Sequence, residues 1–201
     1  MAKTIFLLDN FDSFTYNLVD QFRSMGYPVK IYRNNLSAQL IKQQLDNSED
    51  PVLVLSPGPG NPQQAGCLLE LIGLCKGQIP MLGICLGQQA LVEYYGGHIG
   101  RATQTVHGKA SAIEHDGKRM FRSFENPFPV ARYHSLVATN VPDSLEVCAS
   151  FEKMPMAVLN EQDRVVGYQF HPESILTSQG EKLLQQTLDW LTNGSQEDNA
   201  A

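Results

Sequence analysis

The most restrictive feature of this sequence is a series of short, continuously apolar runs in its first half. The runs "IFLL" (5–8), "VLVL" (52–55) and "IPML" (79–82) lack the polar–apolar alternation of a strand with one solvent-exposed face. Strands of this kind are buried on both faces, and they occur in parallel sheets that helices cover on both sides. The expected strands are residues 3–9, 27–33, 51–57, 79–84 and 164–170.

Segments with helical periodicity lie between these runs. In residues 37–45, for example, the spacing predicts that Leu40, Ile41 and Leu45 face the core. Alternating strands and helices are typical of an α/β fold. The expected helices are residues 13–25, 37–45, 64–76, 88–97 and 178–191.

The second half of the chain changes character. Between residues 98 and 166, turn signals such as His115-Asp116-Gly117 separate short runs of β-prone residues, which indicates antiparallel strands. The predicted fold is therefore α/β, with a mostly parallel central sheet flanked by helices and with antiparallel strands appended. We expect a single domain over residues 1–192 and a polar, disordered tail at 193–201.

Composition excludes several classes of function. The formal net charge of −6 and the absence of any basic run longer than Lys118-Arg119 argue against a nucleic-acid-binding protein. No apolar stretch approaches the 18 residues of a membrane span, and the N-terminus lacks the long apolar region of a secretory signal. We therefore expect a cytoplasmic protein that does not bind membranes.

The cysteines have no metal-ligand or disulfide pattern. Without CxxC spacing or an export signal, reduced thiols are expected, and no metal site is predicted. Three of the four are expected to be packing residues, and Cys85 stays open. These three are Cys67, Cys75 and Cys148.

Ligands of an open parallel sheet bind beyond the carboxyl ends of its strands. Four loops are expected at that edge, because each follows one of the predicted parallel strands. They are "DNFDSF" (9–14), "SPGPGNP" (56–62), "GICLG" (83–87) and "HPES" (171–174).

Cys85 lies in the pattern glycine-x-nucleophile-x-glycine, which is typical of a tight strand-to-helix turn. Gly83 and Gly87 would let the strand and the helix approach closely around a strained residue. The N–H groups at the start of the helix would stabilise a thiolate. By itself the pattern is also compatible with a small core cysteine.

His171 and Glu173 supply what a thiolate nucleophile needs. A histidine can act as general base and then as general acid near neutral pH. Glu173, two residues further on, is placed to accept a hydrogen bond from the imidazole and to set its tautomer. A single histidine at a strand end is more often structural, but a cysteine at the same sheet edge favours catalysis.

The loop "SPGPGNP" does not have the form of a phosphate-binding loop, because it lacks the P-loop lysine and its three prolines donate no hydrogen bond. Amides at Gly58 and Leu86 could instead bind the negative oxygen of a tetrahedral intermediate. A rigid turn without such a role is the equally acceptable alternative.

Five segments together resemble a known family, the class I, or triad-type, glutamine amidotransferases. The stretch "LLDNFDSFTYNLV" (7–19) is similar to the glutaminase subunits of anthranilate synthase and of p-aminobenzoate synthesis. The resemblance extends over about residues 3–192. The five segments are "PGPG", "GICLGQQ", "HGK" (107–109), "YHS" (133–135) and "HPES".

The resemblance implies a role for each matching residue. Cys85 would be the nucleophile, His171 the base and acid, and Glu173 the residue that orients it. Gly58 and Leu86 would be the oxyanion donors. The residues implied to hold L-glutamine are Gly58, Pro59, Gly60, Gln89, Ser135 and Leu136.

The resemblance also implies a partner. A separate synthase chain, component I of anthranilate synthase, would bind chorismate and receive ammonia, with Mg²⁺ on that chain and no cofactor on this one. An aminodeoxychorismate synthase subunit, or one shared by both enzymes, is the alternative. A free-standing γ-glutamyl hydrolase is a further alternative.

Two departures concern neighbouring residues. Related subunits often have histidine at the position of Gln88, but this position lies about 100° around the helix from Gln89, so no catalytic loss is expected. His98 and His115 are interpreted as surface or turn residues. His107 and His134 are interpreted as loop-shaping or partner-facing residues.

Overall fold

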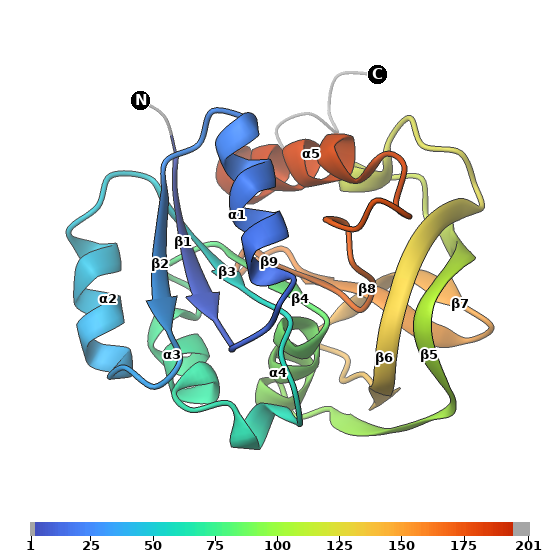
Figure 1. Ribbon diagram of the computed structural model, residues 1–201, viewed down its shortest axis with the longest axis horizontal. Helices are drawn as coiled ribbons and strands as arrows, with labels where there is room; N and C mark the ends of the chain where they lie inside the picture. Colours follow the sequence, from blue (N-terminus) through green and yellow to red (C-terminus); the bar gives the residue numbers. More distant parts are fainter. Residues whose placement is uncertain (1–2, 195–201) are drawn as a thin grey trace.

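Within residues 3–194, which the computed structural model describes, the strands form one mixed sheet of nine in the order β2-β1-β3-β4-β9-β8-β7-β5-β6 (Figure 1). The strands are β1 (Thr4–Asp9), β2 (Val29–Arg33), β3 (Pro51–Leu55), β4 (Met81–Ile84), β5 (His98–His115), β6 (Phe128–Asn140), β7 (Glu146–Phe151), β8 (Met154–Asn160) and β9 (Val165–Tyr168). The α-helices are α1 (Thr15–Ser24), α2 (Ala38–Asp46), α3 (Leu68–Cys75), α4 (Leu86–Tyr94) and α5 (Gly180–Asn193). Two short 3-10 helices are η1 (Pro62–Gln64) and η2 (Arg119–Phe121).

The apolar runs are buried because helices cover both faces of the sheet. In β1, Ile5 and Leu7 pack with α1 and α5, whereas Phe6 and Leu8 pack with α2, α3 and α4. Figure 1 shows the same division, with α1 and α5 on one side of the strands and the other three helices opposite. Each successive side chain of a central strand therefore enters a core layer, and the predicted α/β class is confirmed.

Two helices differ from the prediction in detail. The segment 64–76 is not one helix, because Gly66 has φ +55° and packs so closely on the Asn34 carbonyl that a Cβ there would lie 2.2 Å from its oxygen. In α2, Ile41 and Leu45 are buried, but Leu40 is 45% exposed. Its position lies about 100° from that of Ile41, outside the narrow buried face of α2.

The antiparallel half is present as predicted. β5 and β6 form a long antiparallel ribbon at one end of the sheet, and β5 also pairs with β7. The last strand, β9, returns to the middle, parallel to β4 and antiparallel to β8. The predicted tail falls almost entirely on residues 195–201, outside the described range, and α5 itself continues to Asn193.

Candidate active site

The return of β9 brings distant segments to one edge of the sheet. β1, β3, β4 and β9 lie in this order and run parallel, so the four loops expected to converge do follow neighbouring strand ends. Ile84 is in register with Tyr168, and the Cys85 N–H donates to the Tyr168 carbonyl at 2.7 Å. Cys85 thus lies directly beside the segment that leads to His171.

Cys85 has a strained backbone, with φ +53° and ψ −102°. Close packing holds it there. A Cβ at Gly83 would lie 2.6 Å from the carbonyl carbon of Gly87, and one at Gly87 would lie 2.3 Å from the Leu55 carbonyl oxygen. Only glycine fits at these two positions. The turn holds Cys85 in a conformation that costs about 1–3 kcal/mol, and such strain is common at functional sites.

The helix α4 begins immediately after Cys85, at Leu86, so its amino end lies at the sulfur-bearing residue. The N–H groups of a first helical turn lack intrahelical acceptors and carry partial positive charge, which favours an anion there. Gly58 packs against the same place, since a Cβ on it would lie 2.7 Å from Leu86 Cδ2. The two predicted oxyanion donors are therefore neighbours.

The loop that carries Gly58 is held by hydrogen bonds to Asn10. The Asn10 N–H donates to Ser56 Oγ and the Asn10 Nδ2 donates to the Ser56 carbonyl, both at 2.9 Å. Pro59 and Gly60 follow as exposed residues, and Gly60 has φ +72°. The loop is thus fixed at its base and open to solvent at its tip.

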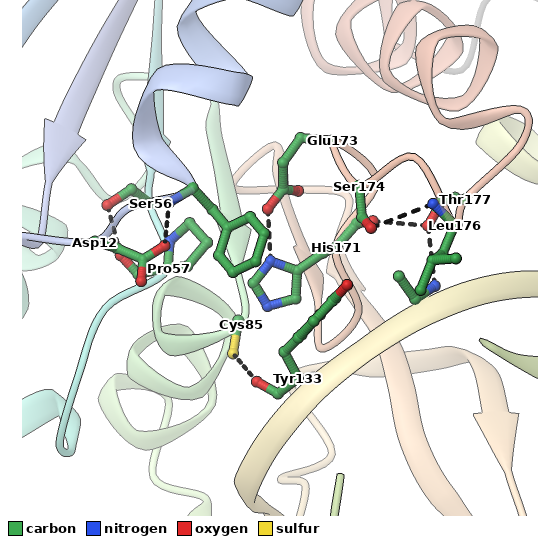
Figure 2. Close-up of polar contacts among 12 residues, drawn as sticks. Asp12, Ser56, Pro57, Cys85, Tyr133, His171, Glu173, Ser174, Leu176 and Thr177 are labelled. Carbon is green, nitrogen blue, oxygen red and sulfur yellow. Dashed lines mark hydrogen bonds and ion pairs between the residues drawn. The ribbon is translucent and has the colours of Figure 1, made fainter. Parts of the chain in front are cut away.

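His171 lies between Glu173 and Cys85, as Figure 2 shows. Its Nδ1 is 2.5 Å from Glu173 Oε1, and its Nε2 has no hydrogen-bond partner within residues 3–194. Burial by itself lowers the pKa of His171. The Glu173 carboxylate and the hydrogen bond with Cys85 outweigh burial, and they raise the pKa above its usual value.

Two aromatic rings hold the imidazole on its sides. Phe14 and Tyr133 each lie with a ring centroid 5.2 Å from that of His171. The Tyr133 carbonyl lies 3.8 Å from Cys85 Sγ and can accept its S–H (Figure 2). β6, which carries Tyr133, therefore closes the site opposite the loop of Gly58.

The predicted glutamine contacts occupy the adjoining part of the site. Gln89, one turn after Cys85 in α4, donates its Nε2 to the Leu136 carbonyl at 3.0 Å. Ser135, beside Leu136 on β6, is exposed. The structure thus brings Gln89 and Leu136 into contact, next to the nucleophile turn.

The comparison with protein families agrees with this geometry, since the family model for class I glutamine amidotransferases matches residues 6–190. The chain belongs to this family. It is 54% identical over 190 residues to anthranilate synthase component 2 of Vibrio parahaemolyticus, covering 94% of this chain and 96% of that protein. The protein of the same name from Haemophilus influenzae is 50% identical over 193 residues, covering 96% and 100% of the two chains.

Solved structures share the amidotransferase fold. A putative GMP synthase glutaminase-type chain from Thermoplasma acidophilum superposes with a TM-score of 0.83 at 22% identity, covering 96% of both chains. A glutamine amidotransferase from Thermotoga maritima gives 0.71 at 17% identity, covering 96% of this chain and 99% of that one. At these identities the likeness concerns the fold alone.

One residue of the amidotransferase site was missed by the sequence analysis. Gln169, fully buried at the end of β9, donates its Nε2 to Cys85 Sγ at 3.6 Å and accepts from Gln89 Nε2 at 3.1 Å. A glutamine between Tyr168 and Phe170, in an otherwise apolar strand, was the available signal. A buried amide needs partners, and its partners here are residues of the site.

The histidine interpretations were partly wrong. His98 and His107 are exposed, but His115 is buried: its Nε2 donates to the Glu125 carbonyl, and its ring stacks on Phe121. His134 is also buried, and within residues 3–194 neither ring nitrogen has a partner. Burial, with the positive charges of nearby arginine and histidine, lowers the pKa of His134 to about 4.

The remaining cysteines are buried free thiols, as predicted for packing residues. Burial raises the pKa of Cys67, Cys75 and Cys148, that of Cys75 to about 12. These thiols are poor nucleophiles near neutral pH, which leaves Cys85 as the reactive candidate.

A pocket of about 410 Å³ opens on the far side of Glu173. Asn17 and Asp20 of α1 and the loop residue Ile175 line it, together with Tyr133 and Glu173. Ile175 is 95% exposed, which is unusual for a large aliphatic side chain beside a buried site.

Metal clusters and membrane-spanning helices are both absent from the described range. Among residues 3–194, no three histidine, cysteine or acidic side chains gather closely enough to hold a metal ion. No helix in the same range is long and apolar enough to cross a bilayer.

Proposed function

We propose that this chain is the glutaminase subunit of an anthranilate synthase, which serves tryptophan biosynthesis by hydrolysing L-glutamine and delivering ammonia to a synthase chain. The observation that carries the proposal is the alignment of Cys85, His171 and Glu173 at the edge of the sheet. In that alignment a proton can pass between sulfur and imidazole.

The reaction begins when the Cys85 thiolate attacks the side-chain carbonyl carbon of glutamine. The imidazolium of His171 then protonates the amide nitrogen, ammonia leaves, and a γ-glutamyl thioester remains on Cys85. The neutral His171 next removes a proton from water, which attacks the thioester and releases glutamate. Glu173 keeps the imidazole in one tautomer and stabilises its charged form.

Two backbone amides stabilise the tetrahedral intermediates. The N–H groups of Gly58 and Leu86 bind the negative oxygen, and each such donor contributes about 10²–10³-fold to the rate. Gln89, with the backbone at Ser135 and Leu136, holds the amino-acid end of the substrate. Pro59 and Gly60 close the glycine-rich loop over it.

The proposed partner is a chorismate-binding component I chain. The relatives named above are called component 2, which supports a second component. The exposed Ile175, beside the pocket next to Glu173, is a suitable contact for that chain. Mg²⁺ on the partner, no cofactor here and a cytoplasmic location complete the proposal.

The alternatives predict different partners. An aminodeoxychorismate synthase subunit would hydrolyse glutamine at the same residues, so the site does not discriminate between the two pathways. The relatives at 46–54% identity favour anthranilate synthase. A free-standing γ-glutamyl hydrolase would be fully active without any partner.

Reconstitution with each candidate synthase chain tests the proposal. Chorismate and glutamine are added, the fluorescent product is identified, and glutaminase activity is measured with and without the partner. We expect anthranilate, and a low glutaminase rate that rises on complex formation. Full turnover of glutamine by the isolated chain would overturn the subunit role.

A further inference from the structure

Gln169 is a fully buried side chain whose amide contacts the candidate site alone. Within residues 3–194, its side-chain hydrogen bonds go to Cys85 Sγ and to Gln89 Nε2. Its backbone N–H is already satisfied by the Met156 carbonyl at 2.9 Å. The strand could therefore continue into the loop of His171 without this amide.

One set of orientations satisfies this cluster of amides. The Leu136 carbonyl oxygen can only accept, so Gln89 must present its Nε2 to it. The same Nε2 lies 3.1 Å from Gln169, which must therefore present Oε1. The Nε2 of Gln169 is then directed at Cys85 Sγ.

This directed chain discriminates between the two forms of the nucleophile. A neutral thiol can donate its proton to the Tyr133 carbonyl at 3.8 Å. A thiolate can only accept, and the Nε2–H of Gln169 is a donor placed to meet it at 3.6 Å. The Gln169 contact therefore stabilises the charged form that attacks the substrate.

The same chain sets the amide of Gln89. With its Nε2 bound to Leu136 and Gln169, the Oε1 of Gln89 accepts no hydrogen bond within residues 3–194. That oxygen is left as an acceptor for an N–H group of bound glutamine. A flip of the amide would offer a donor instead.

We propose that Gln169 is a positioning residue of the glutaminase site, which holds the Cys85 thiolate with its Nε2 and fixes the substrate-facing amide of Gln89 with its Oε1. This inference rests on the proposed function only for its kinetic part. The effect on the sulfur can be measured without any turnover.

Gln88 provides a matched control. It is also a fully buried glutamine next to the site, but neither atom of its amide has a partner within residues 3–194. Its side chain packs against Gly167, where a Cβ would lie 2.8 Å from Gln88 Cγ. Gln88→Met and Gln169→Met both replace a buried amide by an apolar chain of similar size.

The first experiment measures alkylation of Cys85 by iodoacetamide as a function of pH, read on the Cys85 peptide by mass spectrometry. In Gln169→Met the thiolate loses a donor, so the rate at neutral pH should fall about tenfold. The curve should move about one pH unit upward. Gln88→Met should follow the wild-type curve.

The second experiment separates the two ends of the Gln169 amide in the complex with the synthase chain. Gln169→Glu keeps an oxygen that accepts from Gln89 but loses the donor to sulfur. We expect kcat to fall about tenfold with KM for glutamine unchanged. Gln169→Met should lower kcat and also raise KM, because the Gln89 amide is free to flip.

A Gln169→Met protein that is folded by circular dichroism and alkylates along the wild-type pH curve would overturn the inference. If that variant fails to fold, Gln169→Glu decides by the same curve. A purely structural role would lower the amount of active enzyme and leave both KM and the alkylation curve unmoved. Cys85→Ala is assayed in parallel: glutaminase activity in that variant would refute the proposed function and leave the alkylation result standing.

Discussion

The strained turn at Cys85 makes an unusual prediction, that removing the nucleophile's side chain stabilises the protein. Cys85→Ala keeps a Cβ at φ +53°, whereas Cys85→Gly removes it. Relief of strain is worth about 1–3 kcal/mol. Glycine gives back about 0.5–1 kcal/mol through the greater freedom of the unfolded chain.

The free energy of unfolding of Cys85→Gly should therefore exceed that of Cys85→Ala by about 1 kcal/mol. This difference corresponds to a rise of about 2–4 °C in Tm for a chain of this size. Urea denaturation followed by the fluorescence of Trp190 measures it, because this tryptophan is buried against the core. Neither variant should hydrolyse glutamine.

Ala90→Gly in α4 serves as the control for an unstrained position. There the same change should lower the free energy of unfolding by about 1 kcal/mol. A Cys85→Gly protein less stable than Cys85→Ala would show that the turn stores no strain, and the account of how the nucleophile is held would be wrong.

Three further predictions concern other parts of the molecule. The pKa of His134 is about 4 in the folded protein against 6.5 in the unfolded chain, so the unfolded state binds more protons between these values and stability falls as the pH drops from 6.5 toward 4, by up to about 3 kcal/mol. His134→Asn should flatten this part of a urea-denaturation profile; an unchanged slope would contradict the assignment. Ile175→Asp should weaken binding of the synthase chain at least about tenfold in a titration, with an unchanged urea midpoint. Val147→Asp, on β7, should bind normally, and equal binding by both variants would exclude Ile175 from the interface. Gln88→Met should retain full activity and be as stable as the wild type or up to about 2 kcal/mol more stable, because it removes a buried amide without partners; a loss of stability in urea would reveal a partner for that amide.

The sequence predicted the architecture well because its strongest signal is physical. Continuous apolar runs require two covering layers of helices, and residues such as Phe6 and Leu7 do enter opposite layers. The parallel strands then bring their loops to one edge, so Cys85 and His171 could be expected to meet.

The errors arose where tertiary contacts decide. Gly66 breaks a helical pattern because it packs on a carbonyl from another loop, and no local signal indicates that contact. His115 follows a turn-like stretch but is covered by Phe121. Gln169 resembled an ordinary strand residue, because its role depends on register with Cys85 across β4 and β9.

The most direct test of the account is a rapid acid quench of the wild-type complex during glutamine turnover, followed by mass spectrometry of its peptides. We expect one γ-glutamyl group on the peptide that contains Cys85, and neither adduct nor ammonia from Cys85→Ser. An adduct on another residue, or ammonia release by Cys85→Ser at the wild-type rate, would contradict it.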